Sequence, residues 1–179
     1  MRFTVRDFRP EDFDTLWAID QSCFGPEIAY SRYELQLYLH RPGAFTLIAD
    51  QHGEAPPALK NDSPGKHGPS TQSSILGFVV AESNRRGMGH IITIDVSREA
   101  RRHRIGSALL AAAEVRLRAA NCKAVRLETA VDNAFAISFY KRHAYEVIKV
   151  IPHYYSNGLD ALLLEKDLLS IESSASLPK

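Results

Sequence analysis

Cysteine is scarce in this sequence, and neither sign of charge is in excess. The two cysteines, Cys23 and Cys122, lie far apart and form no C-x-x-C pair, which argues against a disulfide framework or a zinc site and favours a reducing compartment. Twenty-two Lys and Arg nearly balance twenty-one Asp and Glu, so the overall charge gives no case for a nucleic-acid binder or a polybasic membrane protein. None of the seven histidines pairs with another at metal-ligand spacing, so no metal is expected.

Long apolar runs are also missing. No run approaches the ~20 residues that a bilayer-spanning helix needs, and residues 1–7 lack the apolar segment of a signal peptide. We therefore expect a cytoplasmic protein that has neither a membrane nor a nucleic acid as its partner. With 179 residues, of which 45% are hydrophobic, the chain is long enough to form one domain around its own core.

Hydrophobic periodicity predicts a mixture of strands and helices. Alternation and β-branched runs predict strands over residues 2–8, 45–50, 75–83, 90–96, 124–130, 145–151 and 161–165. Helical spacing predicts helices over residues 10–20, 31–40, 105–120 and 134–143. Ser31 and Glu34 have the spacing of a capping box. In the third helix we expect Val115 on the apolar stripe and Glu114 on the polar flank.

Two segments carry no such periodicity. Residues 51–74 are rich in Pro, Gly, Ser, Asn and Asp, and a loop of that length is uncommon inside a compact domain. It is either a mobile insertion between two paired strands, which we favour, or a functional lid. The Ser-rich residues 170–179 are predicted to be a disordered tail. The remaining chain, residues 1–169, is predicted to form a single domain.

The sharpest local feature is a basic junction between a β-branched strand and a long helix, over residues 96–107. Unpaired backbone N–H groups and the positive end of the helix dipole suit an anion there, above all a diphosphate. Gly106 would let the backbone approach the phosphates closely. From this segment alone, a solvated arginine cluster is an equally good interpretation.

A family resemblance becomes specific at this junction. The run Arg101-Arg102-His103-Arg104-Ile105-Gly106-Ser107 resembles the GNAT acetyltransferase signature Arg/Gln-x-x-Gly-x-Gly/Ala, whose amides hold the diphosphate of coenzyme A. Arg104 stands where the first glycine is expected. If that position needs a positive φ, a side chain there costs ~1–2 kcal/mol, so either the loop avoids that conformation or the arginine compensates through a phosphate contact. We favour weakened but retained binding of coenzyme A.

A second stretch is similar to another motif of the same family. Asn133 and Tyr140 match the asparagine and tyrosine of Asn-x-x-Ala-x-x-x-Tyr-x-x-x-Gly-Phe/Tyr, with Ala144 in place of the glycine. Residues seven apart lie on one helix face, so both side chains can reach one cofactor. The alternative is that Asn133 only caps the helix and Tyr140 is a core aromatic.

A third set of residues narrows the resemblance to the ribosomal-protein alanine acetyltransferases of bacteria. Glu128 matches their general base, with a surface carboxylate as the alternative. Tyr154 and Tyr155 match residues that border the peptide site in N-terminal acetyltransferases, and ordinary edge aromatics are the alternative.

The resemblance implies a fold and a reaction. The fold is an α/β GNAT fold, with a mixed, mostly antiparallel sheet of about seven strands, four helices and splayed central parallel strands. Acetyl-CoA is the implied cosubstrate, held by the residues of the junction and by the strand residues Ile94, Asp95 and Val96. Glu128 would take a proton from the acceptor amine, and Tyr140 would protonate the departing sulfur.

The acceptor is expected to be the α-amine of a protein N-terminus. Such an amine has a pKa near ~8, against ~10.4 for a lysine side chain, so much more of it is neutral and nucleophilic at neutral pH. We expect direct transfer without an acyl-enzyme, because neither Cys122 nor Cys23, which we place in a loop, has an activating partner in the sequence. Two other functions are the alternatives: acetylation of a small amine, and a module that binds coenzyme A without turnover. The sequence leaves the oligomeric state open.

Overall fold

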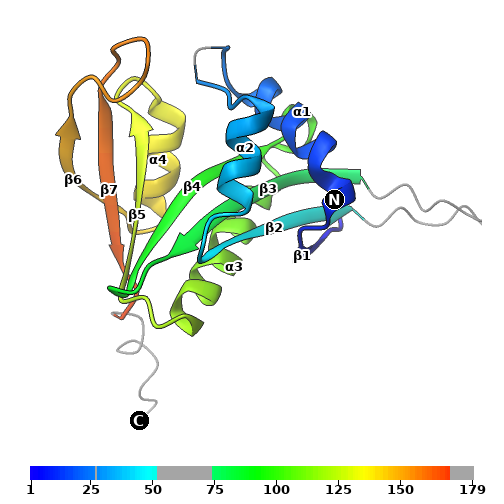
Figure 1. The fold of residues 1–179 in the computed structure, drawn as a ribbon, viewed down its shortest axis with the longest axis horizontal. Coiled ribbons are helices and arrows are strands. Elements are labelled where there is room, and N and C mark those ends of the chain that lie inside the picture. The colour runs from blue at the N-terminus through cyan, green and yellow to red at the C-terminus, as the bar shows by residue number, and fades with distance from the viewer. Residues whose placement is uncertain (27, 52–73, 170–179) are drawn as a thin grey trace, which may run out of the picture.

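The computed structural model describes residues 1–26, 28–51 and 74–169. Its seven strands form one sheet in the order β1-β2-β3-β4-β5-β7-β6 (Figure 1). The strands are β1 (Thr4–Asp7), β2 (Ala44–Gln51), β3 (Ser74–Ser83), β4 (Met88–Val96), β5 (Ala124–Ala130), β6 (Glu146–Ile151) and β7 (Ala161–Asp167). All seven predicted strands are confirmed. Gln51 and Ser74, which we assigned to the insertion, belong to strands; the rest of that segment and the predicted tail lie outside the described residues.

Four α-helices accompany the sheet, as predicted: α1 (Phe13–Cys23), α2 (Arg32–Leu39), α3 (Ile105–Ala119) and α4 (Ala134–Arg142). Short 3-10 turns precede α1 and α3. The capping box at the start of α2 is confirmed, because the Ser31 hydroxyl accepts from the Glu34 N–H and the Glu34 carboxylate accepts from the Ser31 N–H. None of the described helices is long and apolar enough to cross a membrane.

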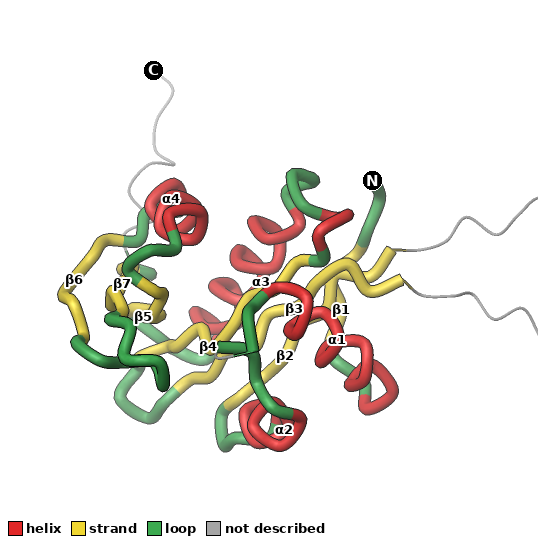
Figure 2. The backbone as a smooth tube through the Cα atoms, turned by 90° about the horizontal axis from the view of Figure 1, so that it is seen from above, coloured by secondary structure: helices red, strands yellow, loops and turns green. Residues whose placement is uncertain are grey.

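The helices cover both faces of the sheet, with α1 and α2 on one face and α3 and α4 on the other (Figure 2). Each face has its own apolar cluster. Our prediction for α3 was wrong in its phase: Leu109, Ala113 and Leu117 face the sheet, while Val115 is 64% exposed. Glu114 is buried, because it accepts hydrogen bonds from Lys166 and from the Tyr145 hydroxyl.

The centre of the sheet is open at one end. Six neighbouring strand pairs make up the sheet, and β4 with β5 is its parallel pair. That pairing runs from Met88↔Ala124 to His90↔Arg126, after which the two strands diverge (Figure 1). The predicted splay of the central parallel strands is therefore confirmed. It leaves the second half of β4 facing an opening instead of a neighbouring strand.

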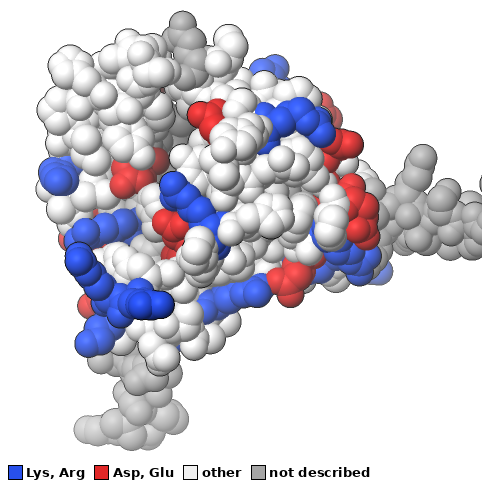
Figure 3. All heavy atoms as spheres, viewed as in Figure 1, with Lys and Arg blue, Asp and Glu red and all other residues white. Residues whose placement is uncertain are grey.

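Basic and acidic side chains are interspersed over the face drawn in Figure 3, with a denser basic group around the corner where β4 and β5 converge. This mixed surface agrees with the near-zero net charge of the sequence.

Candidate active site

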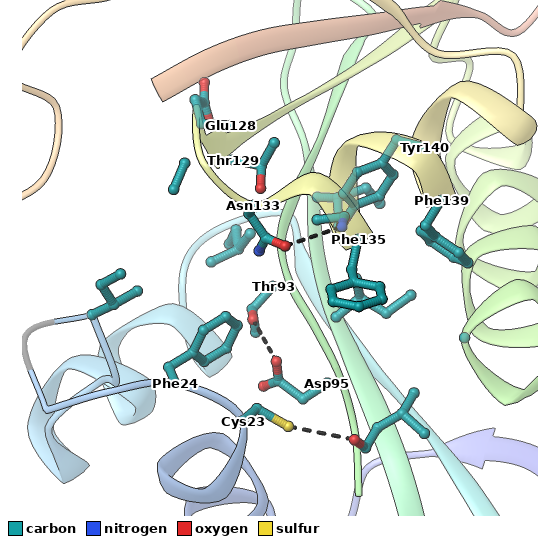
Figure 4. Close-up of a pocket in the computed structure, with 18 of the residues that line it drawn as sticks. Cys23, Phe24, Thr93, Asp95, Glu128, Thr129, Asn133, Phe135, Phe139 and Tyr140 are labelled. Atoms are coloured by element: carbon teal, nitrogen blue, oxygen red, sulfur yellow. Dashed lines mark hydrogen bonds between the residues drawn. The ribbon is translucent and has the colours of Figure 1, made fainter. Parts of the chain in front are cut away.

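A pocket of about 1260 Å³ occupies the opening between β4 and β5. It collects side chains from the α1–α2 segment, β4, the start of α3, the end of β5, α4 and the loop after β6 (Figure 4). The predicted site residues that line it are Ile94, Asp95, Val96, Arg101, Arg102, Arg104, Ile105, Gly106, Ser107, Glu128, Asn133, Tyr140, Tyr154 and Tyr155. His103 is exposed and is not part of this lining.

One end of the pocket is the start of α3. Its N-cap, Arg104, provides no side-chain hydrogen bond, whereas Ser31 and Asn133 cap α2 and α4 with their side chains. The first N–H groups of α3 are therefore left without the usual capping oxygen and point at the pocket end that is rich in arginine. This is the arrangement that binds an anion.

The loop before α3 adopts the strained conformation. Arg104 has φ 62° and Arg102 has φ 66°, both in the left-handed region. The alternative in which the loop avoids a positive φ is therefore wrong, and each arginine carries a backbone cost of ~1–2 kcal/mol. A Cβ on Gly106 would lie 3.6 Å from the Phe139 ring, an ordinary contact, so packing inside the protein does not require this glycine. A ligand that approaches the backbone closely would require it.

Residues 94–96 divide between the two faces of β4. Ile94 and Val96 pack against the cluster beneath α3, while the Asp95 side chain is 1% exposed and points to the α1 side (Figure 4). One Asp95 oxygen accepts from the Thr93 hydroxyl, 3.1 Å away. Burial, followed by the charge of Asp20, raises the pKa of Asp95 well above its usual value.

Helix α4 contributes Asn133 and Tyr140. The Asn133 side chain accepts from the Ala136 N–H at 3.1 Å, so the helix-cap interpretation is confirmed, and the same side chain also lines the pocket. Tyr140 is 7% exposed, and burial, followed by the charges of Asp95 and Tyr155, raises the pKa of its hydroxyl. The hydroxyl therefore keeps its proton at neutral pH and is available as a donor.

The carboxylate of Glu128 is held by a histidine that the sequence analysis missed. His90 Nε2 lies 2.7 Å from a Glu128 oxygen, and its Nδ1 lies 3.6 Å from a Glu82 oxygen. Burial lowers the pKa of His90, but the two carboxylates outweigh burial and the net pKa is raised. The signal was present in the pairing of β4 with β5: His90 stands opposite Arg126, two residues before Glu128, so both side chains share one sheet face.

Aromatic side chains surround the other end of the pocket. The Tyr154 and Tyr155 rings lie edge to face with centroids 5.1 Å apart, and burial raises the pKa of Tyr155 to about 12. Phe24, Tyr30 and Tyr38, from the α1–α2 segment, complete this wall, and they too were missed. The charged side chains of the lining are thus divided: Arg101, Arg102 and Arg104 come from the turn that leads into α3, while Glu128 lies near Tyr154 and Tyr155 and, in addition to burial, raises the pKa of both hydroxyls.

The acetyltransferase (GNAT) family model matches residues 13–145, which is most of the chain. The chain belongs to the GNAT family. Among its curated relatives, an N-alpha-acetyltransferase of Sulfurisphaera tokodaii is 40% identical over 81 residues, covering 45% of this chain and 48% of that protein. The chain spans about half the length of the curated relatives it matches.

Solved structures share the GNAT fold. The Ard1 structure from Thermoplasma volcanium has a TM-score of 0.74 at 24% identity, covering 94% of this chain and 99% of that one. The ribosomal-protein-S18-alanine N-acetyltransferase from Escherichia coli has a TM-score of 0.73 at 15% identity, covering 98% of this chain and 100% of that one. At these identities the likeness establishes the fold.

The position of Cys23 in the fold differs from our expectation. Cys23 is the last residue of α1 and lines the pocket, so placing it in a loop was wrong. Its sulfur lies 3.4 Å from the Val96 carbonyl oxygen. Burial, followed by the charge of Asp95, raises the pKa of the thiol, although Arg101 opposes the shift. A thiol that stays protonated is a poor nucleophile. Among the described residues, no group of three His, Cys, Asp or Glu is arranged to hold a metal.

Proposed function

We propose that this GNAT protein transfers the acetyl group of acetyl-CoA directly to the α-amine of a protein or peptide N-terminus. The observation that carries the proposal is the pocket, which joins an uncapped, arginine-rich helix start to the Glu128–His90 pair across the opening of the sheet. An anionic cosubstrate and a basic acceptor are the ligands that such a pocket suits.

The cofactor end fits coenzyme A on the chemistry of its donors. The amides of Ile105, Gly106 and Ser107 and the side chains of Arg101, Arg102 and Arg104 would hold the diphosphate, and Asn133 and the backbone of residues 94–96 would hold the pantetheine arm. Acetyl-CoA supplies an activated acetyl group as a thioester. Since His103 is outside the pocket lining, we assign it no contact with the diphosphate itself.

Two proton transfers are assigned to the chain. Glu128, oriented by the hydrogen bond from His90, removes the proton that the amine nitrogen must lose as its bond to the acetyl carbon forms. Tyr140 donates its hydroxyl proton to the sulfur as the carbon–sulfur bond breaks. The proton gained by Glu128 and the proton lost by Tyr140 are exchanged with solvent before the next cycle. No side chain becomes acylated, in keeping with the protonated Cys23 thiol.

The acceptor class rests on three observations. A single carboxylate is a weak base, which suits an α-amine of pKa ~8 better than a lysine amine of pKa ~10.4. The aromatic wall of Tyr154 and Tyr155 offers a surface for an extended peptide, and the curated relatives include enzymes named N-alpha-acetyltransferase. The finer assignments are proposals too: a likeness to the ribosomal-protein alanine acetyltransferases, and a cytoplasmic location, supported by two free cysteines.

A small-molecule amine acceptor and a module without turnover are the rival functions. The second is motivated by Arg104 and Ala144, which stand in place of glycines. Both residues nonetheless have a positive φ, at 62° and 64°, so the backbone there lies in the region that glycine favours.

The test is radiolabelled acetyl transfer to a library of short peptides and, in parallel, to polyamines, aminoglycosides and free amino acids. We expect labelling of peptides with a free α-amine and none of the same peptides with a blocked N-terminus. Labelling of small amines alone refutes the N-terminal acceptor. Saturable binding of coenzyme A with no thiol release on any acceptor establishes the module instead, and no binding of coenzyme A to folded protein overturns the whole proposal.

A further inference from the structure

A serine of the pocket is joined to a histidine outside it. Ser107, in the first turn of α3, places its hydroxyl oxygen 3.0 Å from Nε2 of His143, which caps the C-terminus of α4. Ser107 lines the pocket at the arginine-rich end, and His143 does not belong to the lining among the residues described. The contact therefore connects the site proposed for the diphosphate to the far end of another helix, 36 residues away along the chain.

The imidazole is fixed in position from several sides. The Phe139 ring packs edge-on against it, with centroids 4.7 Å apart and an interplanar angle of 72°. The backbone N–H of His143 donates to the Tyr140 carbonyl at 2.9 Å, and the chain then turns at Ala144, whose φ is 64°. The same Phe139 ring borders Gly106. The ring is thus oriented by the helix end and by the aromatic side chain that also flanks the start of α3.

The charges around His143 favour its neutral form. Burial lowers its pKa, and the cations Lys166 and Arg142 act in the same direction, while Glu114 opposes them. A neutral imidazole has one donor and one acceptor nitrogen, so the contact with Ser107 has two possible directions. If Ser107 donates to Nε2, its oxygen lone pairs face the pocket. If Nε2–H donates to Ser107, the serine O–H is free to point at the pocket.

We infer that His143 is a positioning residue for the cosubstrate: its Nε2–H donates to the Ser107 oxygen and so directs the serine O–H toward a diphosphate oxygen. The inference rests on the proposed function, which puts coenzyme A in this pocket. An anion beside Ser107 favours this direction of the hydrogen bond and also favours a positive charge on the imidazole. Binding of the diphosphate is therefore coupled to uptake of a proton by His143.

The sign of the coupling follows from linkage. The bound diphosphate raises the pKa of His143. Affinity for the ligand is therefore highest when the pH is below the pKa that His143 has in the free protein, and it falls as the pH rises through the pKa that His143 has in the complex. The pKa of the free protein lies below the usual value of 6.5. A charge-assisted hydrogen bond is about twice as strong as a neutral one, so we expect affinity to fall about fivefold between pH 5 and pH 8.

The test is calorimetric binding of dephospho-coenzyme A to the full chain, from pH 5 to pH 8.5, in two buffers of different ionisation enthalpy. This ligand keeps the diphosphate but lacks the 3′-phosphate, which would itself titrate near neutrality. The His143→Gln variant keeps a side-chain donor that does not titrate, and Ser107→Ala removes the acceptor of its hydrogen bond. His40→Gln, at the exposed end of α2, is the matched control.

We expect wild type and H40Q to take up a fraction of a proton on binding and to show the fivefold fall. H143Q should bind as wild type does at pH 8 but show neither proton uptake nor the fall. S107A should bind more weakly, and S107A/H143Q no more weakly than S107A. If H143Q retains the proton uptake and pH dependence of wild type, the inference is wrong. If wild type binds no dephospho-coenzyme A and no coenzyme A, the proposed function fails instead.

Discussion

Replacing Arg104 with glycine separates the backbone cost of this residue from the contribution of its charge. In the native structure Arg104 has φ 62° and ψ 14°. Glycine has no left-handed penalty, which raises the free energy of unfolding by ~1–2 kcal/mol. The greater freedom of glycine in the unfolded chain lowers it by ~0.5–1 kcal/mol. The net gain of about 0.5–1 kcal/mol raises the melting temperature by roughly 1–4 °C for a chain of this size. Arg104→Ala keeps the Cβ and the strain but loses the charge, and should therefore melt below Arg104→Gly.

The assay is thermal unfolding by circular dichroism, paired with calorimetric binding of coenzyme A. Both variants lose the guanidinium, so both should lose the same affinity if that group contacts a phosphate. Ala144→Gly, at φ 64° and outside the arginine loop, is the control: it should stabilise the protein by a similar amount and leave affinity unchanged. An Arg104→Ala variant that melts at or above Arg104→Gly would refute the reasoning, because strain would then not be what the arginine costs.

Three further changes test other residues. Glu128→Gln should lower kcat/KM for peptide acetylation by about 10²- to 10⁴-fold while the Kd for coenzyme A stays the same; unchanged turnover removes Glu128 from the proton transfer. Tyr140→Phe should lower kcat by about 10²-fold, with coenzyme A still bound, and a defect in KM alone contradicts its role as a proton donor. Burial raises the pKa of Asp20 from 3.8 to about 6, so the folded state binds the proton of this carboxyl more tightly than the unfolded state does. The protonated carboxyl therefore contributes on the order of 3 kcal/mol to the free energy of unfolding at low pH, and this contribution is lost as the pH rises from about 4 to 6. Asp20→Asn should lack this decrease in urea unfolding; parallel pH profiles for the two proteins contradict the assignment.

The sequence was most informative where local chemistry determines structure. The capping box at Ser31, the alternation in the strands and the spacing in the helices depend on residues a few positions apart, and these elements are confirmed. The phase of α3 was wrong because Glu114 is buried by a partner 52 residues away, Lys166, which no local pattern reveals. The family was recognised from two compact motifs: one covers the loop and first turn of α3, and the other covers α4 from its cap to the turn that follows it.

The candidate site was predicted in part for the same reason. The motif residues Asn133 and Tyr140 were found because a helix fixes their spacing, and they line the pocket with Glu128; their catalytic and binding roles stay predictions. His90 and the aromatic side chains of the α1–α2 segment were missed, since they reach the site through strand pairing and helix packing over long separations. Strand register was the missing piece of information for His90.

The short pairing between β4 and β5 divides the sheet into two sets of strands that are joined weakly to each other. β1–β4 form one well-paired set and β5–β7 another, and the parallel pairing that joins them covers three residues on each side. A ligand seated in the opening touches both sets, so occupancy should restrict their relative motion and slow amide hydrogen exchange along the second half of β4. The rate of amide hydrogen exchange in β4 would then report whether the cosubstrate is bound, independently of any turnover.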